Sequence, residues 1–279
     1  MTISDVTRSD LGRRWLPFKT LTGATPAALS LYCLPHAGGG ASAYLPWLSK
    51  LPGVAVLPVQ LPGREGRLRE PPHKRMAPLI RELADAVLAD GVREWQMVPE
   101  HHSPLTTYPQ GRRPYAVYGH SLGALVAFEL LREFRRRGEP GPVQLFVSGC
   151  VAPHTRFDDG PPVRDMAQRE LVATLRRLGG TPEWLLSDPS VLEMILPAIR
   201  ADFSVKETHR YLPEPPLDVP ITALPSTGDP RASQELVARW REQTTEAFEL
   251  HTLVGGHFAV FEQAALTIKH ISEALRRWV

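Results

Sequence analysis

The stretch AVYGHSLGALVAFELL, Ala116–Leu131, joins a short apolar run to a longer helical pattern, and Ser121 lies at the junction between two glycines. Gly119 and Gly123 permit a turn tight enough to strain the residue between them. In such a strand–turn–helix elbow, the serine hydroxyl stands above the edge of the sheet, where it can attack a carbonyl carbon. The G-x-S-x-G pattern alone is weak, but its position between a strand and a helix predicts that Ser121 is a nucleophile.

Short apolar runs alternate with helical patterns on both sides of this elbow. The expected strands are Leu29–Leu34, Val54–Leu61, Tyr115–Tyr118, Val143–Ser148, Ile221–Leu224 and Phe248–Val254. Strands separated by helices favour an α/β fold in which a mostly parallel central sheet is flanked by helices. We therefore expect a single α/β domain over residues 1–279.

Two regions interrupt this alternation. Residues 95–113 are rich in proline, histidine and polar residues without a sustained period, which predicts an irregular loop insertion. Residues 154–216 contain two helical patterns, Val163–Leu178 and Pro189–His209, where one strand–helix unit is expected. An insertion of helices near the edge of the sheet predicts a lid.

A serine nucleophile needs a histidine base, which an acid must orient. His257, in VGGHFAVFE, follows a strand-like run and precedes the final helical pattern, so we expect it at the same edge of the sheet as Ser121. Asp229, in ITALPSTGDP, follows the strand before it, and the chain order serine, aspartate, histidine is the one expected of an α/β-hydrolase. Asp158 and Asp159, which follow an earlier strand at a greater distance, are the alternative acids.

A glycine loop, LPHAGGGASAY, follows the first core strand. The backbone N–H of Ala37 in this loop and that of Leu122, at the start of the helix after the elbow, predict an oxyanion hole. Gly38 would let the backbone approach a substrate closely. His36 and His120 lie in these same two turns, and we interpret them as turn residues rather than proton carriers.

The overall composition is that of an ordinary globular protein. A net charge of +2 with 22% charged residues lacks the imbalance expected of a nucleic-acid or strong membrane binder. The first residues lack an apolar core of signal-peptide length, and no segment reaches the ~18 apolar residues of a membrane span, so we expect a cytoplasmic protein.

Cys33 and Cys150 lie in apolar runs and are expected to be reduced and buried. No phosphate-loop lysine or metal-ligand spacing occurs, so we expect no cofactor and no metal.

Taken together, the motifs resemble those of a type II thioesterase, the stand-alone editing hydrolase of polyketide and nonribosomal peptide synthesis. The similarity runs from about Trp15 to Trp278 and rests on LPHAGGGASAY, QLPGREGRLREPP, GHSLGA, GDP, GGHF and the lid sequence Leu175–Tyr211. The PGRE segment and the lid sequence are more specific to this family than GHSLGA. Thioesterases fused to synthases usually carry the acid after the earlier strand, so the absence of an aspartate directly after VSGCVAP favours the stand-alone kind.

The resemblance implies an α/β-hydrolase fold with a helical lid, and hydrolysis of acyl thioesters on the phosphopantetheine arm of an acyl or peptidyl carrier protein. It implies that Ser121 attacks the thioester carbonyl, that His257 takes the serine proton, and that Asp229 orients His257. The reaction would remove acyl groups that stall an assembly line. We expect a monomer whose partner is the acyl-loaded carrier protein, without nucleic acid or membrane.

Selectivity for the acyl group is expected to lie in the lid, and Gly38 is a further residue expected to bind the substrate. The lid side chains expected to line the pocket are Leu175, Leu178, Trp184, Leu185, Met194, Ile195 and Ile199. Their helical spacing suits a lid core equally well.

Other functions are compatible with the same residues. A carboxylesterase or lipase of the same fold would carry the same three residues, an acyltransferase would pass the acyl group to an alcohol or amine, and a non-catalytic module would only bind acyl carriers. Carrier proteins commonly present an acidic helix, which basic side chains could steer. The candidates are Arg64, Arg67, Arg69, Arg176 and Arg177.

Overall fold

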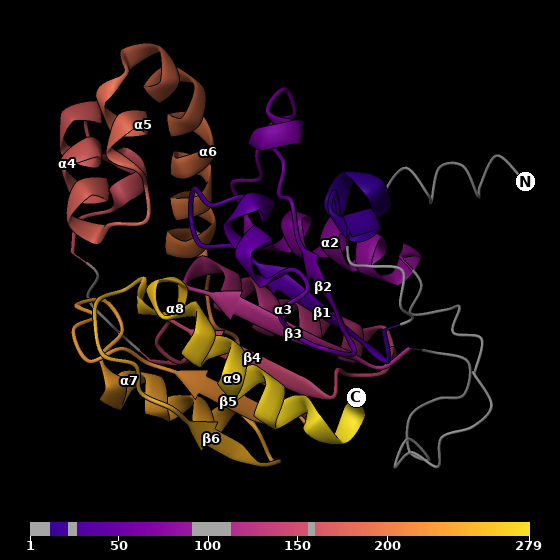
Figure 1. The fold of residues 1–279 in the computed structure, drawn as a ribbon. Helices are drawn as coiled ribbons and strands as arrows, with labels where there is room; N and C mark the ends of the chain where they lie inside the picture. Colours follow the sequence, from indigo (N-terminus) through magenta and orange to yellow (C-terminus); the bar gives the residue numbers. More distant parts are fainter. Residues whose placement is uncertain (1–11, 22–26, 91–112, 156–159) are drawn as a thin grey trace, which may run out of the picture.

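The computed structural model describes residues 12–21, 27–90, 113–155 and 160–279. Within these residues one six-stranded sheet has the order β2-β1-β3-β4-β5-β6, and every neighbouring pair of strands is parallel (Figure 1). The strands are β1 (Leu29–Leu34), β2 (Val54–Pro58), β3 (Tyr115–His120), β4 (Gln144–Ser148), β5 (Ile221–Leu224) and β6 (Phe248–Leu250). The predicted α/β fold with a parallel central sheet is confirmed.

The bounds of β1 and β5 are those predicted, whereas three strands end at other residues. β2 ends earlier than predicted, at Pro58, which has no N–H to donate to a neighbouring strand. β3 runs two residues further, to His120, because this residue still pairs with Ser148 of β4. β6 is an edge strand and ends at Leu250; beyond it, only an isolated bridge joins Leu253 to the loop after β5.

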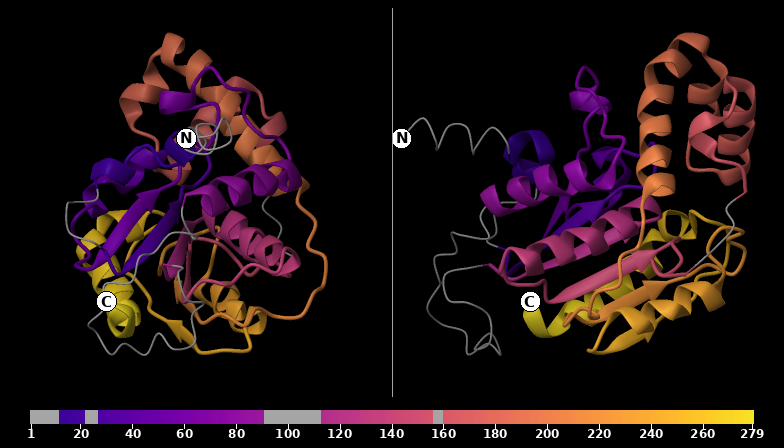
Figure 2. Two further views of the ribbon diagram at one scale, coloured as in Figure 1. Left: turned by 90° about the vertical axis from the view of Figure 1, so that its right-hand side faces the viewer. Right: turned by 180° about the vertical axis from the view of Figure 1, so that it is seen from behind.

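Helices cover both faces of the sheet (Figures 1 and 2). One face packs against α2 (Met76–Ala89), α3 (Leu122–Arg136) and α7 (Gln234–Ala238). The other packs against η2 (Ala41–Trp47), α8 (Ala259–Glu262) and α9 (Ala264–Leu275). Successive strand residues alternate between the two cores, so the strands are buried on both sides, as expected of a parallel sheet.

Further short 3-10 helices of the described residues lie in the connections and near the two ends of the chain. They are η1 (Lys19–Leu21), η3 (Glu65–Arg67), η5 (Val163–Asp165), η6 (Arg239–Gln243) and η7 (Arg276–Trp278). Both cysteines are buried and free, as predicted. Among the described helices, none combines the length and the apolar composition that crossing a membrane requires.

A bundle of three helices is inserted between β4 and β5, in the region predicted to form a lid. It consists of α4 (Gln168–Leu178), α5 (Glu183–Ser187) and α6 (Pro189–Thr208), and it projects from one end of the sheet (Figures 1 and 2). The bundle has its own apolar cluster, which includes Leu171, Leu175, Leu196, Ile199 and Phe203. The short helix α5 was not expected from the sequence. The predicted irregular loop lies, up to residue 112, outside the described residues.

Two glycines of the elbow let α3 pack directly against the end of β1. A Cβ at Gly123 would overlap the carbonyl oxygen of Leu34, and a Cβ at Gly119 would overlap the carbonyl group of Gly123. Neither obstacle is a flexible side chain, so the clash could be relieved only by moving backbone. The glycines therefore fix the distance between the elbow and the loop that follows β1.

We predict that Gly123→Ala lowers the free energy of unfolding by about 1–3 kcal/mol or more, because overpacking at a backbone contact cannot relax. Urea denaturation monitored by circular dichroism measures this change. Gly66→Ala is the matched control, since a Cβ at Gly66 meets nothing within 4 Å. Equal stability of the two variants would contradict the close approach.

Candidate active site

Ser121 lies at the elbow between β3 and α3 in a strained backbone conformation. Its φ is 55°, in the region that non-glycine residues rarely adopt. The strain is held in place because the Ser121 N–H donates to the Ser148 carbonyl at 2.8 Å and α3 begins at the next residue. Backbone strain of this kind often accompanies functional sites. It presents the hydroxyl at the wall of a cavity.

His257 and Asp229 form a buried hydrogen-bonded pair beside this cavity. His257 Nδ1 lies 2.7 Å from Asp229 Oδ2, and the aspartate side chain is fully buried. Since a carboxylate only accepts, His257 donates from Nδ1, which leaves its Nε2 as the acceptor of the neutral ring. The other oxygen of Asp229 accepts the backbone N–H of Arg231 at 2.9 Å.

The loops that carry these two residues are tied together by backbone hydrogen bonds. The Gly228 N–H donates to the Gly255 carbonyl at 2.7 Å, and the Thr227 N–H donates to the Leu253 carbonyl at 2.9 Å. The loops follow β5 and β6, which are adjacent parallel strands, so their shared sheet edge places them side by side. The orientation of the histidine ring is thus fixed by the fold as well as by Asp229.

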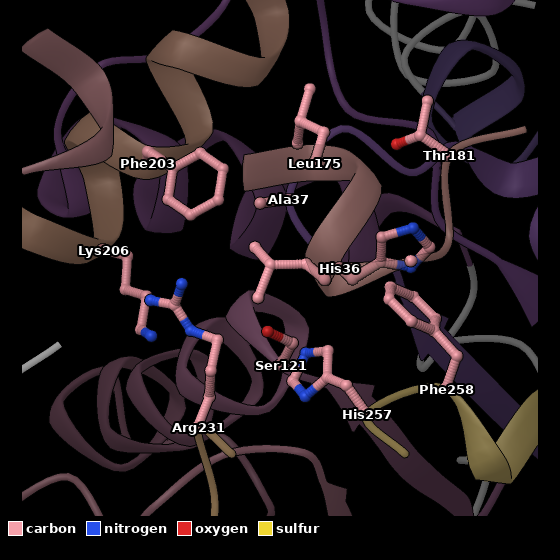
Figure 3. Close-up of a pocket in the computed structure, with 12 residues that line it drawn as sticks. His36, Ala37, Ser121, Leu175, Thr181, Phe203, Lys206, Arg231, His257 and Phe258 are labelled. Atoms are coloured by element: carbon pink, nitrogen blue, oxygen red, sulfur yellow. The ribbon is translucent and has the colours of Figure 1, made fainter. Parts of the chain in front are cut away.

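A cavity of about 440 Å³, which includes its open mouth, lies between this sheet edge and the helical bundle (Figure 3). From the sheet edge it is lined by His36, Ala37, Ser121, His257 and Phe258. The bundle contributes apolar walls from Leu175, Leu178 and Phe203. Thr181, Lys206 and Arg231 add polar groups. The cavity therefore offers an apolar space beside a serine and a histidine.

The two residues predicted to form an oxyanion hole lie at the expected loop and helix start. Ala37 lines the cavity and is part of a tight turn, closed by the Gly39 N–H donating to the His36 carbonyl at 3.0 Å. Leu122 is the first residue of α3, where a backbone N–H has no acceptor within its own helix. The two backbone N–H groups are therefore candidate donors to an oxyanion, and this role stays a prediction.

Several residues predicted to line the pocket do not line this cavity. Trp184 and Met194 are 68% and 46% exposed, because the buried face of the small bundle is formed by other residues of α4 and α6. Ile195 packs into the apolar cluster of the bundle instead. Gly38 faces α6, and its N–H donates to Asp202 at 2.7 Å. Helical spacing alone did not distinguish the inner from the outer face of the bundle. Leu185 and Ile199 do not line the cavity either.

Two of the arginines predicted to steer a carrier protein are buried. Arg64 forms an ion pair with Asp202, and Arg67 forms one with Glu70 while its guanidinium lies 4.4 Å from the ring of Trp15. Both are therefore structural residues, which corrects the prediction. Arg69, Arg176 and Arg177 lie at or near the surface, although Arg176 pairs with Glu183 and Arg177 donates to Thr174. The alternative acids, Asp158 and Asp159, lie outside the described residues.

Three imidazole rings contact Phe258, and those of His36 and His257 also line the cavity. The ring of His120 lies 4.9 Å from that of His257 and 5.9 Å from that of His36, and Phe258 contacts all three rings. Burial, and to a smaller extent the neighbouring His257, lowers the pKa of His36 to about 3 and the pKa of His120 well below its usual value. His120 Nδ1 also lies 2.9 Å from Ser148 Oγ. Both rings are neutral at physiological pH.

The sequence did not predict how the bundle rests on the sheet edge. Gly180, just after α4, has a φ of +79°, and a Cβ there would overlap the ring of Phe258. The turn after α4 therefore sits directly on the residue that follows His257. Both partners of this contact lie in glycine motifs, the GG pair after Leu178 and GGHF, but only the fold brings the two motifs together. Across the described residues, no cluster of three or more metal-ligating side chains occurs.

The neutral histidines predict that stability falls in acid. Because the pKa of each is lower in the folded state than in the unfolded chain, the unfolded state binds more protons below about pH 6.5. The free energy of unfolding then falls with decreasing pH by up to about 1.4 kcal/mol per pH unit for each histidine. The variant His120→Asn preserves an acceptor for Ser148 but cannot be protonated. In urea denaturation between about pH 7 and pH 5, its free energy of unfolding should therefore depend less on pH, by the contribution of one protonating group. An unchanged slope would show that His120 is protonated in the folded state.

The chain is similar to a known protein family and to several known proteins. The sequence matches the family described as thioesterase domain over residues 30–91 and 100–275. Thioesterase PikA5 of Streptomyces venezuelae is 38% identical over 253 residues, which cover 90% of this chain and 83% of PikA5.

Two solved structures agree with the sequence comparison. RedJ, a thioesterase from the prodiginine pathway of Streptomyces coelicolor, has a TM-score of 0.76 and 38% identity, covering 89% of this chain and 91% of RedJ. BorB, a type II thioesterase from the borrelidin biosynthetic cluster, has a TM-score of 0.75 and 38% identity, covering 90% of this chain and 94% of BorB. By sequence and by its α/β-hydrolase fold, the chain belongs to the thioesterase family, with type II thioesterases among its relatives.

Proposed function

We propose that this thioesterase hydrolyses acyl thioesters on the phosphopantetheine arm of acyl or peptidyl carrier proteins, and so clears stalled acyl groups from a polyketide or nonribosomal peptide assembly line. The observation that carries this proposal is that Ser121 and His257 line one cavity under the helical bundle, with His257 held by the buried Asp229. The relatives named for assembly-line pathways support the substrate class.

The first half of the reaction acylates Ser121. The Ser121 hydroxyl oxygen attacks the thioester carbonyl carbon while His257 Nε2 accepts its proton, and Asp229 stabilises the imidazolium through Nδ1–H. As the tetrahedral intermediate collapses, the C–S bond breaks and the thiol leaves with the proton from His257. A thiol has a pKa of ~8.5, so its departure needs little assistance.

The second half returns the enzyme to its resting state. Water enters the cavity, His257 removes one of its protons, and the hydroxide oxygen attacks the acyl carbon of the ester at Ser121. The C–O bond to Ser121 breaks, the serine regains its proton from His257, and the acid is released. In both halves the N–H groups of Ala37 and Leu122 hold the negative oxygen, each typically worth ~3 kcal/mol in the transition state.

The cavity suits an acyl chain at one end and a pantetheine arm at the other. Leu175, Leu178 and Phe203 provide apolar contact for the acyl group, while Thr181 offers a hydrogen-bonding side chain to the amide-rich arm. The carrier protein itself would dock outside, where Arg69 and Arg177 are candidates to meet an acidic helix. We propose that the enzyme acts as a monomer in the cytoplasm, where carrier-bound intermediates are made.

Single-turnover hydrolysis in H₂¹⁸O tests the proposed reaction. The wild-type chain should release the acid from an acyl-loaded carrier protein with one ¹⁸O atom, detected by mass spectrometry, because water is the acceptor. Ser121→Ala should release none beyond the uncatalysed rate. Transfer of the acyl group to an added alcohol or amine, or release that persists in Ser121→Ala, would refute a serine-dependent hydrolase.

The role of Asp229 has its own test. We predict that Asp229→Asn lowers kcat by about 10³- to 10⁴-fold, because the amide cannot hold the required histidine tautomer or stabilise its charge. Asp218→Asn, at an exposed aspartate before β5, is the matched control. Near-normal turnover of Asp229→Asn together with loss in Asp158→Asn would reassign the acid.

A further inference from the structure

A buried carboxylate on the bundle contacts the predicted oxyanion loop. Asp202 lies on α6 and is 3% exposed. Its Oδ2 accepts the backbone N–H of Gly38 at 2.7 Å, the amide that directly follows Ala37. In addition, Gly38 has no room for a side chain, since a Cβ there would lie 2.8 Å from Ile199 on the same helix.

Arg64 completes this contact from a third element. It lies in the PGRE segment after β2, is 7% exposed, and pairs with both oxygens of Asp202, at 2.8 Å from Nη2 to Oδ1. The same guanidinium donates to the Gly39 carbonyl at 3.2 Å. The N–H of Gly38 and the C=O of Gly39 are therefore both held by one buried ion pair.

Gln60, just before the PGRE segment, holds the loop at its far end. Gln60 Oε1 accepts the Ala41 N–H at 3.0 Å, and Gln60 Nε2 donates to the Arg64 carbonyl at 3.3 Å. α6 and the segment after β2 thus fix the backbone from Gly38 to Ala41, and the side chains of Asp202, Arg64 and Gln60 do not line the cavity. The Gly38 N–H lies in the peptide unit that follows Ala37, and the Ala37 N–H lies in the unit that precedes it. The two units meet at the Cα of Ala37, so holding the Gly38 unit restricts the φ and ψ of Ala37 and with them the direction of its N–H.

We propose that Asp202 and Arg64 are positioning residues that orient the Ala37 N–H toward the oxyanion, so that the oxyanion hole is complete only when α6 is seated on the loop. The inference rests on the proposed function, because it assigns the Ala37 amide to the reaction. It also explains why a helix of the bundle, rather than the core domain alone, supplies the carboxylate. The transition state is then stabilised by this N–H only when the bundle contacts the loop.

Asp202→Asn tests this proposal with a soluble acyl-pantetheine thioester. The variant should lower kcat by about 10- to 100-fold while KM changes by no more than about twofold, because an oxyanion donor acts in the transition state and not in substrate binding. A trifluoromethyl ketone analogue, which forms a tetrahedral adduct with Ser121, should lose affinity by a similar factor. A non-hydrolysable thioether analogue, which forms no oxyanion, should bind as tightly as to wild type.

Glu129→Gln is the matched control for the loss of a buried carboxylate. Glu129 lies on α3, pairs with Arg132 and His209 at 3.0 Å each, and does not line the cavity. If Asp202→Asn lowers kcat no more than Glu129→Gln does, or if KM rises while kcat is kept, the positioning role is wrong. Equal loss of affinity for both analogues would also overturn it.

A second variant covers the case in which Asp202→Asn does not fold. Arg64→Lys keeps the charge but loses the planar fork that reaches both Asp202 and Gly39, so it should show the same selective fall in kcat. Unchanged kcat in Arg64→Lys would refute the proposal. Failure of the proposed function is seen separately, as wild-type hydrolysis that does not depend on Ser121.

Discussion

The close contact between the start of α3 and the end of β1 sets the geometry on which the candidate site depends. Gly123 lies so near the Leu34 carbonyl that no side chain fits between them. The contact brings the N–H of Leu122 and the loop that contains Ala37 to one place, and it leaves Ser121 in a strained conformation between two rigid elements. Backbone packing thus brings a serine and two candidate oxyanion donors together.

The parallel sheet brings the remaining groups to the same edge. The loops after β1, β3, β5 and β6 contribute Ala37, Ser121, Asp229 and His257, and all lie at the carboxyl ends of their strands, where parallel α/β sheets commonly bind ligands. The helical bundle then covers this edge. It touches the sheet domain through Gly180 on Phe258 and through Asp202 on the loop after β1, so it contacts both the histidine side and the oxyanion side of the cavity.

Much of this arrangement could be predicted from local sequence patterns. The predictions that were wrong concern side chains whose surroundings are set by tertiary contacts. The elbow, β1, β5 and the residues Asp229 and His257 are marked by glycines, apolar runs and chain order, which are local signals. Arg64 was misjudged because its burial depends on Asp202, which lies 138 residues away in the sequence.

The pocket walls show the same limit of local patterns. Trp184 and Met194 have the spacing of a buried helical face, yet the bundle is too small to bury every apolar side chain. Phe258, in contrast, is marked only as the neighbour of His257, and its place against Gly180 follows from tertiary packing. Which face of a short inserted helix points inward is decided by contacts that the sequence pattern does not contain.

The most direct test of a carrier-editing thioesterase is kcat/KM for one short acyl group presented in three ways: on a phosphopantetheinylated carrier protein, as a pantetheine thioester, and as an oxygen ester. We predict that both thioesters are preferred over the oxygen ester, most strongly on the carrier protein, and that Ser121→Ala abolishes all three activities. A preference for the oxygen ester would contradict the proposed substrate class while leaving the serine and histidine chemistry intact.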